Sequence, residues 1–383
     1  MTCRLAHRKP LRVLHLSAGN LYGGIETFLV TLARCQRASM DSVFGLCFDA
    51  QVARELRLAG AEVRQLGSTR LSRPWTVRQA RQTLVDLLSR EGFDVVICHG
   101  TWPLTVFGGT VSKSGVPLAY WAHSPPMRHF LDRLAARANP QLVITNSRFT
   151  LGEHRAVFPD SSKVVLRYPV LPNAVDDRLV ARRALRRELR TPDEDVVIVC
   201  SSRLEPWKGH RLLLGALAGM QKVGGWTAWI AGGAQRKQES EYLADLTKQA
   251  VDSGLSSRVR FVGQRTDVPS ILAASDIHCQ PNTGPEPFGI AFIEALYAGL
   301  PVVTSNLGAA SEIVTSACGL LVAADVGPLT EALSRLVQSE ETRMELAAGG
   351  PSRAAEMCGP ETTMAAIERE LSVFSERSEG LEA

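Results

Sequence analysis

The segment Pro285-Glu-Pro-Phe-Gly-Ile-Ala-Phe-Ile-Glu294, followed by Ala-Leu-Tyr-Ala-Gly-Leu-Pro-Val-Val-Thr304, joins a loop, a helix and a strand. Phe288, Gly289 and Ile290 are predicted to form the first helical turn, where Gly289 leaves room for a bound group to approach the backbone. A helix start exposes unpaired N–H groups that favour phosphate. The segment therefore predicts an α/β unit whose helix start binds an anion.

The same alternation of short apolar strands and amphipathic helices continues along the chain. Predicted strands are Arg12–Ser17, Ser42–Phe48, Glu62–Gln65, Val95–Cys98, Leu118–Ala122 and Leu142–Thr145, then Val164–Leu166, Val196–Ser201, Trp226–Ala231, Val259–Val262, Ile277–Gln280 and Pro301–Thr304. Predicted helices include Glu26–Arg37, Trp75–Glu91, Gly209–Gln221, Glu239–Ser253 and Leu329–Ser339. Such alternation predicts parallel sheets covered by helices. Two consecutive sets predict an α/β fold of two doubly wound, Rossmann-like domains facing each other across a cleft.

The domain boundary is predicted in Tyr168-Pro-Val-Leu-Pro-Asn-Ala-Val-Asp176, because its two prolines exclude a continuous helix or a central strand. We expect residues 1–172 to form the first domain and residues 173–360 the second. Residues 361–383 are expected to form a C-terminal helix that packs back on the first domain and ends in a frayed tail. Ligands bind at the carboxyl ends of the strands in such sheets, and the candidate motifs all lie there.

Composition excludes several classes of protein. The 383 residues are 45% apolar and 21% charged, and a net charge of +4 is too small to indicate a nucleic-acid partner. Eight cysteines form no C-x-x-C pair, which favours buried thiols over disulfides or a metal site. The apolar run Leu11–Leu16 is too short for a signal peptide, and no run reaches the length of a membrane span. These patterns predict a cytoplasmic protein.

Two glutamates, Glu286 and Glu294, stand eight residues apart around the helix start. The expected helix is apolar nearly all round, so Glu294 is expected to be buried, and a buried carboxylate needs a partner. Eight helical steps span about 12 Å, more than the roughly 5–9.5 Å between the carboxyls of a glycosidase. The pair therefore fits two ends of one ligand that carries ribose, diphosphate and hexose. The simpler interpretation is one charge at a helix N-terminus and one surface residue.

A second candidate element, Ser201-Ser-Arg-Leu-Glu-Pro-Trp-Lys-Gly-His210, follows a predicted strand. Arg203 and Lys208 on this loop can hold a diphosphate, the arginine as a bidentate fork and the lysine as a point charge. They would stabilise a leaving nucleotide without a metal. Cations on a loop are usually solvated, but their position upstream of the two glutamates favours the binding role.

Gly23 and Gly24, in Ser17-Ala-Gly-Asn-Leu-Tyr-Gly-Gly-Ile-Glu-Thr27, precede a predicted helix and permit close approach of a bound group. The same place invites an alternative interpretation as a nicotinamide-dinucleotide site. Asp49, after the second strand, favours that alternative, and the absence of G-x-G-x-x-G opposes it.

Two histidines, His99 and His123, come at the ends of predicted strands. A lone histidine is more often structural than catalytic. Ser124-Pro-Pro126 holds His123 on a rigid turn, so we predict that it orients hydroxyls of the donor or the acceptor. His99 is the weaker candidate.

With these residues in place, the chain resembles the retaining glycosyltransferases of family 4, which have the GT-B fold. The resemblance runs from the first strand to about Val322 and is most specific where E-x7-E, R-L-x-x-x-K-G and Gly-Leu-Pro-Val-Val occur in family order. The segment Leu171–Asp176 resembles the family's P-N-G-V-D, with Ala174 in place of the glycine. Two further departures are Gly308, which stands alone where a glycine pair is common, and Pro287, which replaces the commoner glycine.

The resemblance implies a role for each matching residue. Glu286 would contact the transferred sugar, Glu294 the ribose, and Arg203 with Lys208 the diphosphate. The implied catalytic set is His123, Glu286, Arg203 and Lys208, and the implied nucleotide-sugar-binding set is Gly23, Gly24, Arg203, Lys208, Glu286, Phe288, Gly289, Ile290 and Glu294. Residues 1–172 would be the acceptor-side domain and residues 173–360 the nucleotide-sugar-binding domain. Transfer would retain the anomeric configuration and need no cofactor or metal.

The function predicted from the sequence is transfer of a sugar from a nucleoside-diphosphate sugar to an acceptor hydroxyl. A nicotinamide-dependent oxidoreductase and a non-catalytic nucleotide-sugar-binding protein are the alternatives. The sugar, the base, the acceptor and the oligomeric state are not named by these residues. Met127–Ala138 has basic residues among apolar ones, which fits an ordinary amphipathic helix or a peripheral contact with the inner membrane face. The basic helix Val180–Arg190 is interpreted as a solvated face.

Overall fold

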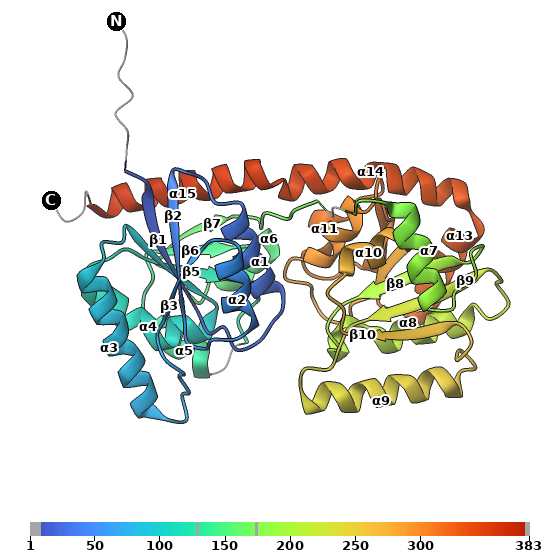
Figure 1. The fold of residues 1–383 in the computed structure, drawn as a ribbon, viewed down its shortest axis with the longest axis horizontal. Helices are drawn as coiled ribbons and strands as arrows, with labels where there is room; N and C mark the ends of the chain where they lie inside the picture. Colours follow the sequence, from blue (N-terminus) through green and yellow to red (C-terminus); the bar gives the residue numbers. More distant parts are fainter. Residues whose placement is uncertain (1–8, 128–129, 173–174, 380–383) are drawn as a thin grey trace, which may run out of the picture. The chain divides into compact units, whose positions relative to one another are not determined.

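The computed structural model describes residues 9–127, 130–172 and 175–379. The chain divides into two compact units. Unit 1 comprises Met1–Pro169 with Cys358–Ala383, and unit 2 comprises Val170–Met357. Each is an α/β structure built on one parallel sheet (Figure 1). The predicted fold class, two Rossmann-like α/β domains, is confirmed.

The sheet of unit 1 has the strand order β3-β2-β1-β4-β5-β6-β7. The strands are β1 Leu11–Ser17, β2 Met40–Leu46, β3 Glu62–Gln65, β4 Val95–His99, β5 Leu118–Ala122, β6 Leu142–Thr145 and β7 Ser162–Val165. The helices are α1 Gly24–Arg34, α2 Gln51–Leu58, α3 Pro74–Arg90, α4 Thr101–Ser114, α5 Phe130–Ala136, α6 Arg148–His154 and α15 Pro360–Glu379. The strand order reverses between β1 and β4, which is where doubly wound sheets bind ligands. Arg37 pairs with Glu368 at 2.8 Å and ties α15 to the end of α1.

The sheet of unit 2 repeats this pattern in the order β10-β9-β8-β11-β12-β13. Its strands are β8 Val196–Ser201, β9 Trp226–Ala231, β10 Val259–Gly263, β11 Ile277–Gln280, β12 Val302–Ser305 and β13 Gly319–Val322. The other elements are α7 Arg178–Glu188, the 3-10 turn η1 Pro206–Lys208, α8 His210–Gly219, α9 Lys237–Asp252, α10 Val268–Ala273, α11 Ile290–Tyr297, α12 Ala310–Ile313, α13 Val326–Gln338 and α14 Glu340–Cys358. The order reverses between β8 and β11, so the loops after these two strands lie side by side.

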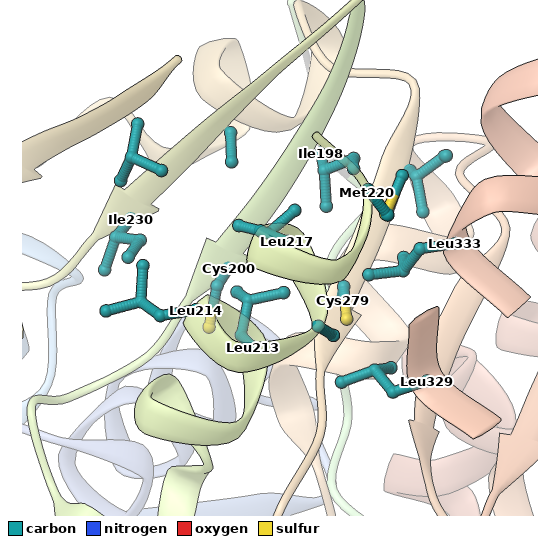
Figure 2. Close-up of a cluster of buried hydrophobic side chains, with 14 of the residues drawn as sticks. Ile198, Cys200, Leu213, Leu214, Leu217, Met220, Ile230, Cys279, Leu329 and Leu333 are labelled. Atoms are coloured by element: carbon teal, nitrogen blue, oxygen red, sulfur yellow. The ribbon is translucent and has the colours of Figure 1, made fainter. Parts of the chain in front are cut away.

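The core of unit 2 explains why these two loops are held firmly. Leu213, Leu214 and Leu217 on α8 pack against β8 and against α13, and all three are fully buried (Figure 2). Full burial of a leucine side chain contributes about 1.5–3 kcal/mol. The apolar side chains of β8 and α8 therefore anchor both ends of the loop that carries Arg203 and Lys208.

Most predicted strands agree with the structure, and the differences have local causes. Helix α11 begins at Ile290, so the prediction that Phe288 belongs to its first turn is wrong. The reason is Gly289, whose φ of 100° is a left-handed conformation outside the helix. Strand β13 and helix α14 were not predicted. Helix α14 contains Pro351, a residue that usually ends a helical pattern.

The interpretation of the basic helix α7 as a solvated face is only partly correct. Arg178 donates to the carbonyl oxygens of Ala273 and Ala298, which lie at the ends of α10 and α11. Arg186 is 1% exposed and pairs with Asp276 at 2.8 Å. Cations are favourable at helix C-termini because the last carbonyl groups lack partners within the helix. These arginines therefore hold α7 against α10 and α11.

None of the described helices combines the length and the apolar character needed to cross a bilayer.

Candidate functional site

Glu286 lies on the loop between β11 and α11, where its backbone is clamped by the loop after β12. The Glu286 N–H donates to Leu307 O at 3.3 Å, and the Ala309 N–H donates to Glu286 O at 2.8 Å. Gly308, between these partners, has a φ of 67°, and a Cβ there would lie 2.5 Å from Glu286 N. Glycine is thus required at this position. Gly308, the single glycine in this loop, therefore has a structural role.

The Glu286 carboxylate is 5% exposed and is the centre of a buried polar cluster. Its Oε2 accepts from Lys208 Nζ at 2.9 Å, from Asn282 Nδ2 at 2.7 Å and from Gln280 Nε2 at 3.2 Å. A buried carboxylate is stable only when paired and hydrogen-bonded. Gln280 and Asn282 were missed by sequence reasoning, although their position at the end of β11, next to a candidate loop, was a usable signal.

Lys208 reaches this cluster because the loop after β8 packs closely on the loop after β11. Gly209 has a φ of 78°, and a Cβ there would lie 1.8 Å from Pro281 O. The Thr283 N–H donates to Trp207 O at 2.8 Å. The Lys208 ammonium group also lies 4.0 Å from the centre of the Trp207 ring. Close backbone packing therefore brings together a cation and a carboxylate that are far apart in sequence.

Arg203 has a different environment from Lys208. Its side chain is 40% exposed and pairs with Glu205 at 3.1 Å instead of joining Lys208 at Glu286. Glu205 also accepts from Trp207 Nε1 at 3.1 Å. A diphosphate role for Arg203 stays a prediction, since it needs the guanidinium to exchange a carboxylate for a phosphate.

Glu294 lies in the second turn of α11 and is partly buried. Desolvation by the surrounding chain raises the pKa of its carboxyl to about 7. The Phe288 side chain is 3% exposed and points into the core, so this residue can offer a ligand only its backbone. Gly289 is the N-cap of α11 and Ile290 is its first residue. An anion-binding role for this helix start stays a prediction.

In unit 1, Gly23 is the N-cap of α1 and Gly24 is its first residue. Gly23 has an extended backbone with a φ of −167°, which any residue can adopt, so conformational freedom is not the reason for this glycine. Gly24 is exposed. Both residues lie after β1, next to the reversal of strand order in unit 1.

His123 lies after β5 and is 7% exposed. Its Nε2 is 3.0 Å from Nδ1 of His99, and its Nδ1 is 2.5 Å from the Tyr168 hydroxyl. Both histidines predicted from strand ends are thus joined in one buried chain. Tyr168 was noted only for the prolines that follow it, so its part in this chain was missed.

Among the described residues, no group of three or more His, Cys, Asp or Glu side chains is arranged to hold a metal ion. Arg128, His129, Asn173 and Ala174, which belong to segments singled out in the sequence, lie outside the described residues.

Comparison with known proteins identifies the family. The model described as "Glycosyltransferase Family 4" matches residues 22–179, and the model described as "Glycosyl transferases group 1" matches residues 181–353. Together they cover most of both units. The group 1 match contains the clusters around Glu286 and Lys208, and the family 4 match contains His123.

Relatives of known function agree with these matches. A GDP-mannose-dependent monoacylated alpha-(1-6)-phosphatidylinositol monomannoside mannosyltransferase of Corynebacterium glutamicum is 26% identical over 354 residues, which are 86% of this chain and 88% of the relative. A GDP-mannose-dependent alpha-(1-6)-phosphatidylinositol monomannoside mannosyltransferase of Mycobacterium tuberculosis is 31% identical over 245 residues, 60% of each protein.

Solved structures agree on the fold. HepE of Anabaena, crystallised with UDP and glucose, matches with a TM-score of 0.83 and 25% identity over 94% of this chain and 99% of that one. Sucrose-phosphate synthase of Thermosynechococcus elongatus matches with a TM-score of 0.78 at 17% identity, over 94% and 98% of the two chains. The oxidoreductase and the non-catalytic alternatives have no support in these matches.

Proposed function

The chain belongs to the family 4 glycosyltransferases with the GT-B fold, and we propose that it transfers mannose from GDP-mannose to a lipid-linked acceptor. The class of reaction, transfer from a nucleotide-sugar to an acceptor, follows from the family. Mannose and guanine are proposed because relatives in Corynebacterium and Mycobacterium are GDP-mannose-dependent. Retention of the anomeric configuration and independence of metal are proposed from the resemblance to retaining members of the family.

The observation that carries the proposal is the buried pair of Lys208 and Glu286 beside the start of α11. A cation and a carboxylate that share one small volume match a ligand in which a diphosphate adjoins a polyhydroxylated sugar. In the proposed complex, the Lys208 ammonium group and the first N–H groups of α11 neutralise the diphosphate. Glu286 accepts hydrogen bonds from hydroxyls of the transferred sugar. The charge that develops on the leaving GDP then meets fixed positive groups, which is the task that a metal performs in other enzymes.

We assign the remaining predicted residues by the same argument. Arg203 supplies a second cation to the diphosphate, and Glu294 accepts from the ribose hydroxyls. Phe288, Gly289 and Ile290 contribute backbone groups. In unit 1, Gly23 and Gly24 are assigned to the border of the nucleotide-sugar and the acceptor, and His123 is assigned to the reacting centre.

The lipid-linked acceptor is supported by relatives whose substrates are phosphatidylinositol monomannosides. In unit 1, both α3 and α5 carry exposed aromatic and basic residues. Trp75 is 67% exposed and Phe130 is 71% exposed, and Arg73, Arg78 and Arg133 lie within a few residues of them in sequence. Aromatic and cationic side chains of this kind favour a peripheral contact with an anionic lipid surface. The double variant Trp75→Ser, Phe130→Ser tests this contact. The native protein should sediment with anionic vesicles, and the double variant should not.

A thermal-shift panel tests the proposed donor. The panel compares GDP, UDP and ADP, each with and without its sugar, at equal concentrations. GDP-mannose at a hundred times its Kd should add about 2.7 kcal/mol of stability. A larger shift with UDP-glucose than with GDP-mannose would refute the assignment of guanine and mannose and leave the family unaffected.

The same panel, measured against pH, tests Glu294. The carboxylate must be charged to accept from two ribose hydroxyls, and its pKa is raised to about 7 by burial. If only the charged form binds, the affinity for GDP-mannose should fall about tenfold between pH 8 and pH 6. GDP-mannose suits this measurement because its diphosphate diester does not titrate in that range. Glu294→Gln is the control: its affinity should be weaker at pH 8 and independent of pH, and an unchanged slope would contradict the role.

A further inference from the structure

The core of unit 1 contains an unbroken chain of hydrogen-bonding side chains that the proposed reaction does not explain. His15 Nδ1 is 2.9 Å from His99 Nε2, His99 Nδ1 is 3.0 Å from His123 Nε2, and His123 Nδ1 is 2.5 Å from the Tyr168 hydroxyl. Asn146 Nδ2 donates both to the Tyr168 hydroxyl at 2.9 Å and to His123 O at 3.0 Å. We call His15, His99, His123 and Tyr168 the histidine chain.

The strand register explains how three residues distant in sequence meet. His15 on β1 is paired with Ile97 on β4, and His99 lies two residues beyond Ile97. His99 is paired with Trp121 on β5, and His123 lies two residues beyond Trp121. Two residues along a strand return a side chain to the same face of the sheet. The chain therefore runs diagonally across one face, from the interior toward the carboxyl edge where the candidate site residues lie.

Each ring of the histidine chain is neutral. His15 and His99 are at most 2% exposed, and Phe28, Phe44 and Trp121 stack or tilt against the imidazole rings at centroid distances of 5.1 to 6.0 Å. Burial among these groups lowers the pKa of His15 and of His123 to about 3, and it holds the pKa of His99 well below its ordinary value. A neutral imidazole carries one N–H and one acceptor nitrogen. Each link in the chain then needs one donor and one acceptor, and the direction chosen at one end determines every other link.

His15, the innermost residue of the histidine chain, determines the direction of these hydrogen bonds. His15 Nε2 is buried without a hydrogen-bond partner. Buried N–H groups without a partner are rarer than buried acceptors without one. The hydrogen of His15 therefore belongs on Nδ1, where it can donate to His99 Nε2. His99 must then donate from Nδ1 to His123 Nε2, and His123 from Nδ1 to the Tyr168 hydroxyl oxygen.

We propose that His15 and His99 are positioning residues for sugar transfer, which fix His123 as a hydrogen-bond donor to Tyr168 and so hold the turn after β5 in one arrangement. The inference rests on the proposed function in one respect, the assignment of the His123 turn to the reacting side of unit 1. In this arrangement both ring nitrogens of His123 are engaged inside unit 1, so His123 acts through position and not as a proton acceptor. His15 is fully buried, so it acts only through His99.

The first test reads the hydrogen positions in the native enzyme. Long-range 1H–15N correlation of the histidine side chains, with each ring assigned through its own backbone resonances, separates Nδ1–H from Nε2–H. We expect Nδ1–H for His15, His99 and His123 alike at neutral pH. Nε2–H on any of the three would overturn the proposed direction. This measurement needs neither a variant nor a substrate, so it is independent of the proposed donor and acceptor.

The second test separates positioning from folding. His99→Phe keeps an aromatic ring in the stack and removes both links, and Cys98→Ala changes a fully buried neighbour on the same strand that has no part in the chain. Misplacement of reacting groups can cost about a hundredfold in rate, so His99→Phe should lower kcat by roughly tenfold to a hundredfold while KM for the donor changes little. Cys98→Ala should keep kcat. Equal kcat in His99→Phe and the native enzyme would overturn the proposal, whereas wild-type inactivity with GDP-mannose would count against the proposed donor alone.

Discussion

Lys208→Met is expected to lower sugar transfer by roughly a thousandfold, because loss of one preorganised charge-stabilising group typically costs about 10²–10³ in kcat. It should also lower the free energy of unfolding of unit 2 by about 3–5 kcal/mol, since removal of one partner leaves a buried charge uncompensated. Glu286 would keep two hydrogen-bond donors, Asn282 and Gln280, and both are neutral amides. Steady-state kinetics and urea unfolding measure the two effects separately.

The double variant Lys208→Met with Glu286→Gln distinguishes structure from catalysis. A neutral amide at position 286 no longer requires the cation, so most of the lost stability should return while transfer stays abolished. Arg203→Met is the matched control for stability. The arginine of its pair with Glu205 is 40% exposed, and exposed pairs contribute only about 0–1 kcal/mol to the free energy of unfolding. Transfer at the native rate by Lys208→Met would remove the central element of the proposed mechanism.

Acidification is expected to destabilise unit 1 through the histidine chain. In the folded state the pKa of His15 and of His123 lies at about 3, and that of His99 is also strongly lowered. The unfolded chain takes up protons near pH 6.5, so this stability is complete above pH 6.5 and is lost as the pH falls. At pH 5.5 the rings of His15 and His123 should each cost about 1 kcal/mol relative to pH 8, and His99 adds to the loss in the same direction.

Hydrogen exchange by mass spectrometry measures this loss within unit 1, because peptides from β4 and β5 report on it without interference from unit 2. His15→Asn cannot be protonated at this position and should reduce the pH-dependent loss by about 1 kcal/mol. Glu294 in unit 2 has the opposite sign: its raised pKa favours the folded state at low pH, and this contribution is lost as the pH rises toward about 7. Constant protection of β4 and β5 from pH 8 to pH 5.5 would show that the rings are not held neutral.

Much of the fold was readable from local patterns. Strands such as Leu118–Ala122 and Trp226–Ala231 were predicted at their observed bounds, because a buried parallel strand is a short apolar run between polar loops. Strand β13 was missed, since Gly319–Val322 is short and begins with a glycine. The start of α11 was misplaced by two residues, because a left-handed glycine and a helical glycine look alike in sequence.

The site was readable only in part. Lys208 and Glu286 could be proposed from their motifs, but their mutual hydrogen bond depends on Gly209 and Gly308 allowing backbones to pack closely. Asn282 and Gln280 were not predicted as site residues, because the type of a polar residue after a strand does not indicate which side chain it will contact. The motif that identifies Arg203 as a candidate does not predict its ion pair with Glu205.

The sequence by itself determined two α/β units, most of their strands and the family to which the chain belongs. These depend on periodicity, on glycine and proline positions and on short motifs, all of which are local along the chain. Only the tertiary structure decided that His15, His99, His123 and Tyr168 form one chain and that Lys208 pairs with Glu286. Strand order and register place these residues together, and both result from packing between segments that the linear pattern does not relate.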